Sequence, residues 1–377
     1  MDFDLSWLLW GLPIAFVLGW LASRLDLRQM RIENRQAPKA YFRGLNFLLN
    51  EQQDQAIDAF IEAVQNDPDT SELHFALGNL FRRRGEYERA VRVHEHLLSR
   101  GDLARADRHR AQHALALDYL KAGLLDRAEE ALRKLEGTAY EGQALLALLA
   151  IYERSRDWTQ AAEIAQKLED AGQGNFSGRL AHYLCEDASS APPEVARQLL
   201  QEAIRLAPAT PRPGIEFAAL QRRAGDRDGA FRTLAQLAQA SPAGLPLIAR
   251  PLTEAAIASG MQAEALDILK ANYEQLPSLD VLEGIVALEP DAAAARQWYA
   301  RHLEREPSLV AATKWLAGET LAQEQFHPNV QRALDHAVKP LVRYRCAACG
   351  FEAKQHFWQC PGCQAWDSYP ARRVEEL

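Results

Sequence analysis

The sequence lacks the short motifs that mark several common classes of enzyme. It has no Gly-x-x-x-x-Gly-Lys-Ser/Thr phosphate loop, no Gly-x-Gly-x-x-Gly after a strand pattern, no Gly-x-Ser-x-Gly and no His-Glu-x-x-His. Helical repeat scaffolds, which the residue spacing of this chain indicates, also offer no obvious catalytic site. We therefore expect a protein that is not an enzyme.

The sequence also lacks an excess of positive charge, and it contains few β-strand patterns. The 43 Lys and Arg residues are outnumbered by 51 Asp and Glu residues, so the net charge is -8. This balance argues against general nucleic-acid binding. Alternating runs of β-branched residues are few, whereas the good helix formers Ala, Leu, Glu, Arg and Gln are abundant. The composition predicts an all-α fold.

An alanine recurs at nearly constant spacing through most of the chain. Successive members of the series are separated by 34, 38, 33, 35, 34, 35 and 30 residues, close to the length of a helix-turn-helix repeat. The series consists of Ala56, Ala90, Ala128, Ala161, Ala196, Ala230, Ala265 and Ala295. We interpret it as a tetratricopeptide-repeat superhelix, or solenoid, of about eight units.

The first repeat shows the physical basis of the pattern. Gly44 and Ala56 stand where two antiparallel helices must approach closely, and Phe47 and Phe60 fill the gaps that remain. Pro68 then stops the second helix. Repeats of this kind present a groove that binds peptides or protein surfaces.

An uncharged, apolar segment lies near the N-terminus. The nineteen residues from Leu5 to Ser23 carry no charge, and at about 1.5 Å per residue a helix of that length spans about 28 Å, close to the thickness of a bilayer core. A cleaved secretory signal would need a basic region before the segment, where Asp2 and Asp4 stand instead. We expect a transmembrane anchor at residues 1–23.

Basic residues follow the predicted anchor immediately. Arg24, Arg28, Arg31 and Arg35 are spaced four, three and four residues apart, which places them on one face of a helix at 24–36. Basic residues on one flank of a span mark its cytoplasmic side, so the rest of the chain is expected to face the cytoplasm. The arginines either set this topology only or also form a docking face for a membrane partner.

Few side chains within the array stand out as functional. Asn79 and Arg82 are candidates for a partner-binding groove, although a solvated face is the favoured interpretation. The histidines between residues 94 and 113 have no acidic partner at a recognisable spacing, which favours ordinary surface histidines. Cys185 is expected to pack in the core.

Four of the five cysteines lie close together at the C-terminus. Cys346 and Cys349 form one Cys-x-x-Cys pair, and Cys360 and Cys363 form a second pair shortly after it. Two such pairs turn four thiolates toward one metal ion, and Gly350 and Gly362 are expected to allow the tight backbone. Four thiolates leave no open position for catalysis, so we expect structural zinc, with iron as the alternative.

The order of these parts resembles the lipopolysaccharide assembly protein B family of Gram-negative bacteria. The resemblance covers essentially the whole chain: an anchor at 1–23, a basic juxtamembrane helix at 24–36, the array at 37–340 and a rubredoxin-like zinc ribbon at 341–377. Its most specific parts are the segments Tyr344–Gly350 and Trp358–Trp366 around the four cysteines.

The resemblance implies a single-pass adaptor of the inner membrane, with the array and ribbon in the cytoplasm. Such adaptors promote degradation of the lipid A deacetylase LpxC by the membrane AAA+ protease FtsH, and a further inner-membrane regulator of lipopolysaccharide synthesis restrains them. The ribbon would pack against the concave side of the array. Two alternatives stay open: a scaffold that assembles envelope enzymes without any proteolytic link, and an electron-transfer module if the ribbon holds iron.

Overall fold

The computed structural model describes residues 16–18, 20, 39–67, 69–319 and 324–377, and these residues form two compact units, split between Ser155 and Arg156. Within them no helix has both the length and the apolar character needed to cross a membrane. Most of the predicted anchor at 1–23 lies outside the described residues, as do Arg24, Arg28, Arg31 and Arg35. The anchor and its basic flank stay predictions.

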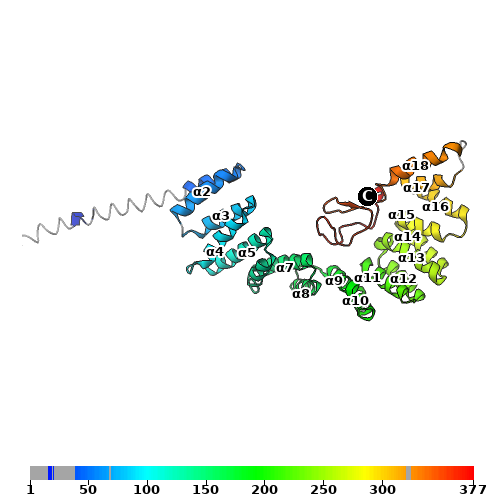
Figure 1. The fold of residues 1–377 in the computed structure, drawn as a ribbon, viewed down its shortest axis with the longest axis horizontal. Coiled ribbons are helices and arrows are strands. Elements are labelled where there is room, and N and C mark those ends of the chain that lie inside the picture. The colour runs from blue at the N-terminus through cyan, green and yellow to red at the C-terminus, as the bar shows by residue number, and fades with distance from the viewer. Residues whose placement is uncertain (1–15, 19, 21–38, 68, 320–323) are drawn as a thin grey trace, which may run out of the picture. The chain divides into compact units, whose positions relative to one another are not determined.

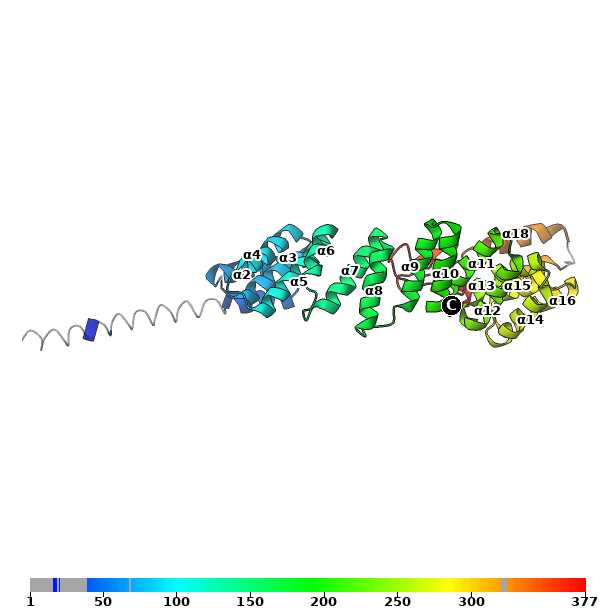
Figure 2. The ribbon, with the colours of Figure 1, turned by 90° about the horizontal axis from the view of Figure 1, so that it is seen from below.

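Unit 1 consists of helices joined by short turns (Figures 1 and 2). Residues 39–49 are helical. The helices that follow are α2 (Gln53–Asn66), α3 (Ser71–Arg84), α4 (Tyr87–Ser99), α5 (Arg105–Ala122), α6 (Leu125–Arg133) and α7 (Glu141–Ser155).

Unit 2 continues with helices and ends in a small ribbon. Its helices are α8 (Trp158–Asp170), α9 (Ser177–Ser190), α10 (Pro193–Leu206), α11 (Pro211–Arg223), α12 (Arg227–Ala240), α13 (Leu245–Ser259), α14 (Gln262–Gln275), α15 (Leu279–Leu288), α16 (Ala292–Arg305), α17 (Leu309–Ala317) and α18 (His327–Val338). Short 3-10 turns occupy Pro242–Gly244, Glu324–Phe326 and Val374–Glu376. The ribbon contains β1 (Tyr344–Arg345) antiparallel to β2 (Glu352–Ala353).

The alanines of the repeating series lie on the even-numbered helices from α2 to α16, one on each. All are buried except Ala295 of α16, which is half-buried. Because the alanine side chain is a single methyl group, the partner helix can pack directly against that point. The small-residue pattern therefore marks helix contacts, as the sequence predicts.

Glycines on the partner helices make room for larger side chains of the next helix. A Cβ atom at Gly44 would lie 2.8 Å from Phe60 Cε2, and one at Gly78 would lie 2.5 Å from the His94 ring. Gly85 serves differently: its φ of +84° ends α3, and the Glu86 amide then donates to the Phe81 carbonyl. Gly44 and Gly78 thus allow two helices to approach closely, whereas Gly85 allows a helix to end.

His94 is fully buried, which corrects the expectation of a surface histidine. Its Nδ1 pairs with Asp118 Oδ2, and Arg82 Nη1 lies 2.8 Å from Asp118 Oδ1. The three side chains join α3, α4 and α5 inside unit 1. Asp118 has no exposed surface, so this ion pair satisfies a charge that would otherwise be buried alone.

Gly78→Ala should destabilise unit 1, because the new Cβ would overlap the His94 ring. Overpacking costs about 1–3 kcal/mol, and the better helix propensity of alanine offsets about 1 kcal/mol of that cost. We expect faster hydrogen exchange of the α3 and α4 amides in the full chain. Gly101→Ala is the control, since nothing lies within 4 Å of its Cβ position. Equal exchange in the two variants would contradict this packing.

Candidate metal centre

The four C-terminal cysteines converge as the sequence predicts. The Sγ atoms of Cys346, Cys349, Cys360 and Cys363 all lie within 4.8 Å of one another. Cys346 Sγ lies 3.8 Å from Cys363 Sγ, and Cys349 Sγ lies 3.7 Å from Cys360 Sγ. A tetrahedron with metal–sulfur bonds of about 2.3 Å has edges of about 3.8 Å, so these sulfurs fit one metal ion.

Each Cys-x-x-Cys pair lies on a tight turn closed by one backbone hydrogen bond. The Gly350 amide donates to the Cys346 carbonyl at 2.8 Å, and the Gln364 amide donates to the Cys360 carbonyl at 2.8 Å. Gly350 has a φ of +78°, as expected, but in the second turn the positive φ, +63°, belongs to Gln364. The prediction for Gly362 was wrong by two positions, because the left-handed residue follows the second cysteine of each pair.

The surroundings of the thiols favour thiolate at some positions and oppose it at others. A hydrogen bond with the Ser368 hydroxyl lowers the pKa of Cys346 to about 6. The Phe351 amide favours ionisation of Cys349, but desolvation and the neighbouring sulfurs raise the pKa of Cys349 to about 12. Four thiolates this close repel one another unless a cation lies between them. The donor set therefore matches a closed, structural metal site.

Aromatic side chains surround the metal centre. Tyr344 and Tyr369 form a small buried core with Cys346 and Cys360. The His356 ring lies 4.6 Å from the Trp358 ring, its Nε2 lies 3.1 Å from the Tyr369 carbonyl, and burial lowers the pKa of His356. A segment this small cannot build an adequate core alone, which supports a structural role for a metal ion at this site.

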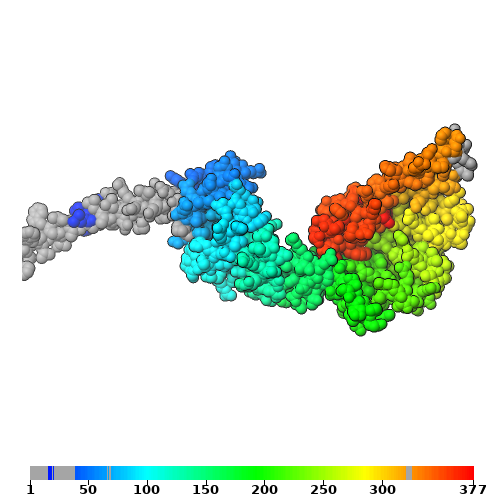
Figure 3. Space-filling model, in the orientation of Figure 1, coloured from blue at the N-terminus to red at the C-terminus, as the bar shows by residue number. Residues whose placement is uncertain are grey.

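The ribbon packs on α9, α13, α15 and α17 of unit 2 (Figure 3). Helix α11 contacts both α9 and α13, and we call the face formed by these five helices the inner face. Asp367, with a φ of +49°, accepts a hydrogen bond from the fully buried His182 of α9 at 2.8 Å. The Trp366 ring stacks on His182 at 4.9 Å and meets Trp158 of α8 edge-on. Leu247 of α13 packs against the ribbon core. The ribbon is thus fixed to unit 2 at one end by aromatic and polar contacts.

The C-terminal residues fix the other end of the ribbon. Arg373 donates from Nε and Nη2 to both oxygens of Asp280, at 2.9 and 2.7 Å. Burial opposes the charge of Arg373, but the hydrogen bonds and charge of Asp280 raise its pKa above the usual value. The Glu375 carboxylate accepts from the amides of Leu309 and Val310 at the start of α17, and Glu376 accepts from the Leu279 amide at the start of α15. Carboxylates at helix N-termini are favoured by the helix dipole.

Sequence reasoning missed these docking residues, and it singled out other ones in unit 1. His182 and Asp367 are 185 positions apart, and Asp280 and Arg373 are 93 apart, so no local spacing connects them. In unit 1, the Arg82 guanidinium bonds Asp118, the Ala114 carbonyl and the side chain of Asn79. Partner binding by Asn79 and Arg82 stays a prediction. Cys185 is buried among apolar side chains of α9 and α10, as expected.

Replacing Cys346 and Cys360 together by alanine should abolish metal binding, because two of the four sulfurs are lost. Native mass spectrometry and elemental analysis of the full chain should find one metal ion per wild-type chain and none in the variant. Cys185→Ala is the matched control, since this thiol lies outside the metal centre. A variant that kept its metal, or a control that lost it, would contradict the assignment.

Asp280→Asn should loosen the C-terminal end of the ribbon, because it leaves the mostly buried Arg373 without its carboxylate partner. Breaking such a pair costs about 2–5 kcal/mol. We expect faster trypsin cleavage after Arg373 in the full chain. Glu130→Gln removes the exposed 2.7 Å pair with Lys134 in unit 1 and serves as the control. The loss of this pair is expected to have little effect on stability, because both side chains are exposed to solvent. Equal cleavage rates in the two variants would argue against the clamp.

The chain matches known proteins over almost its entire length. Residues 344–369 match a family model described as "Rubredoxin metal binding domain". Lipopolysaccharide assembly protein B of Escherichia coli K12 is 30% identical over 97% of this chain and 98% of its own length, and that of Haemophilus influenzae is 28% identical over 95% and 96%. A solved tetratricopeptide repeat protein of Parabacteroides merdae is similar with 14% identity and a TM-score of 0.36, over 67% of this chain and 99% of its own. On its full-length similarity to the Escherichia coli protein, the chain belongs to the lipopolysaccharide assembly protein B family.

Proposed function

We propose that this protein acts in lipopolysaccharide assembly as a non-catalytic adaptor that binds other proteins. The observation that carries the proposal is the similarity to lipopolysaccharide assembly protein B over 97% of the chain. The helical array with its docked ribbon supports it, because such arrays offer extended surfaces for protein partners. The name that the relatives share indicates lipopolysaccharide assembly as the process, and the helical array indicates protein binding as the activity.

The proposed mechanism is regulation by tethering. The anchor at 1–23 holds the array and ribbon at the cytoplasmic side of the inner membrane, where the arginines at 24–35 meet membrane partners. The array binds the lipid A deacetylase LpxC and brings it to the protease FtsH, so two weak contacts act together at high local concentration. A further inner-membrane protein restrains the adaptor. Deacetylase turnover then limits lipopolysaccharide synthesis.

In this mechanism the metal has a structural role, and we propose that it is zinc. When bound, the ion neutralises Cys346, Cys349, Cys360 and Cys363 and holds the ribbon together. The folded ribbon then places Asp367 against His182 and Glu375 at the start of α17. These contacts keep the ribbon on the inner face of unit 2 and so shape the surface that partners meet. Elemental analysis that found iron would favour the electron-transfer alternative instead.

The half-life of the lipid A deacetylase in cells tests the proposal. Cells carrying the Cys346→Ala, Cys349→Ala variant at matched, membrane-localised levels should degrade the deacetylase severalfold more slowly than cells carrying the wild type, because an unfolded ribbon no longer supports partner binding. Cys185→Ala should leave the half-life unchanged. An unchanged half-life in the cysteine variant, and equally in cells depleted of the whole protein, would overturn the adaptor role and leave the scaffold or the electron-transfer module.

A further inference from the structure

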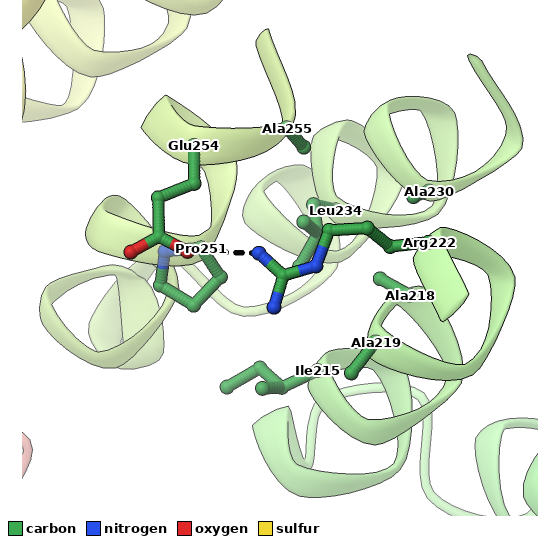
Figure 4. A pocket seen from close by; sticks show the side chains of 9 residues that line it. All are labelled: Ile215, Ala218, Ala219, Arg222, Ala230, Leu234, Pro251, Glu254 and Ala255. Atoms are coloured by element: carbon green, nitrogen blue, oxygen red, sulfur yellow. Dashed lines mark hydrogen bonds and ion pairs between the residues drawn. The ribbon is translucent and has the colours of Figure 1, made fainter. Parts of the chain in front are cut away.

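A pocket opens on the inner face of unit 2 between α11 and α13 (Figure 4). Helix α11 contributes one face, with residues spaced by three and four positions, and α12 supplies the floor. We call it the α11–α13 pocket. It is lined by Ile215, Ala218, Ala219, Arg222, Ala230, Leu234, Pro251, Glu254 and Ala255. Ala230 and Leu234 of α12 close the back of the pocket.

The size and lining of the pocket suit one apolar side chain. Its volume is about 110 Å³, somewhat less than the roughly 150 Å³ of an engineered cavity that holds benzene. Four alanines leave the space, and Ile215, Leu234 and Pro251 form its walls. A branched aliphatic side chain of leucine or isoleucine size fills such a space without the strain of an aromatic ring.

The rim of the pocket carries more positive than negative charge. Arg222 and Glu254 face each other across the mouth at 2.9 Å (Figure 4). Arg250 precedes the lining residue Pro251 and lies 3.0 Å from the same carboxylate. Both arginines are more than half exposed, at 53% and 87%. Two guanidinium groups share one carboxylate here, so their remaining donors can bind a second carboxylate. The rim is therefore complementary to an acidic ligand.

The pocket lies next to the docked ribbon. Leu247 packs against the ribbon core, and Pro251 lines the pocket. These residues are four positions apart on α13, so they lie on the same helix face about one turn, or 5.4 Å, from each other. A segment bound in the pocket would run beside the ribbon on the inner face.

From these observations we propose that the α11–α13 pocket is a peptide-binding site, and that it holds one aliphatic side chain of a partner protein's acidic segment. The aliphatic side chain enters between α11 and α13, and a neighbouring carboxylate pairs with Arg222 and Arg250. The site rests on the proposed adaptor function, since it supplies the array with a partner contact. It adds a position and a ligand chemistry that neither the family relationship nor the metal centre assigns.

A peptide titration of the full chain in lipid nanodiscs tests the site. The probe is the blocked peptide Gly-Ser-Glu-Leu-Glu-Ser-Gly, and binding is followed by methyl NMR of alanine, isoleucine and leucine. We expect saturable shifts of the Ile215, Ala219 and Leu234 methyl signals. A peptide with glycine in place of leucine, and one with lysine in place of both glutamates, should each bind at least about tenfold more weakly, or about 1.4 kcal/mol. Equal binding of either peptide would overturn the proposal.

Variants of the rim and the floor separate binding from folding. Arg222→Glu should lower the affinity for the acidic peptide about tenfold and raise the affinity for the lysine peptide, because the charge of the rim is inverted. Arg223→Glu is the matched control: it makes the same charge change at the adjacent exposed residue outside the pocket. Ala219→Trp should block both peptides by filling the space. Equal losses in Arg222→Glu and Arg223→Glu would overturn the site.

The titration contains no deacetylase, so its failure is distinct from failure of the adaptor function. No peptide binding, together with a deacetylase half-life that still depends on the metal centre, would overturn the pocket alone. Peptide binding at the pocket, together with a half-life that does not respond to loss of the whole protein, would support the pocket and overturn the adaptor role. A longer deacetylase half-life in cells with Arg222→Glu than in cells with Arg223→Glu would support both the peptide site and the adaptor role.

Discussion

Close packing between consecutive helices is the constraint on which this structure depends. Ala56, Ala90 and Ala128 have no exposed surface, and each lies where a neighbouring helix would collide with a larger side chain. Gly78 extends the same principle, since the His94 ring occupies the space that a Cβ would need. The array thereby gains close contacts between successive helices, with buried apolar clusters between them.

The ribbon shows how a small metal site can act on a larger helical unit. The four sulfurs fit one metal ion, which would offset the repulsion between thiolates. The folded ribbon presents Trp366 and Asp367 at one end and Arg373 to Glu376 at the other. Glu375 and Glu376 lie at the N-termini of α17 and α15, where their charge complements the helix dipoles. Burial raises the pKa of Glu376, and its hydrogen bonds to the Leu279 and Arg373 amides favour the charged form. The last residues of the chain thus contact the starts of helices that lie 97 and 66 positions earlier in the sequence.

Two kinds of surface meet on the inner face of unit 2. The ribbon covers the beginnings of α15 and α17 and contacts α9 and α13, whereas the α11–α13 pocket stays open beside it. The metal centre and the proposed peptide site therefore share the inner face of unit 2.

The sequence by itself determined the helices, the buried small residues and the four sulfur ligands. These features depend on local hydrogen bonds, on a period near 34 residues and on the short reach of a Cys-x-x-Cys turn, and all of them are readable within a few tens of residues. It also indicated the family, because the order of modules extends along the whole chain. Even locally it misplaced the left-handed residue of the second turn, which is Gln364.

Only the tertiary structure decided which distant residues meet. The burial of His94 against Asp118, the pairing of His182 with Asp367 and the clamp of Arg373 on Asp280 join residues 24, 185 and 93 positions apart. Such pairs depend on the angle at which successive helices stack and on where the ribbon folds back. The sequence periodicity does not determine these angles, because each angle depends on many side-chain contacts along the helices.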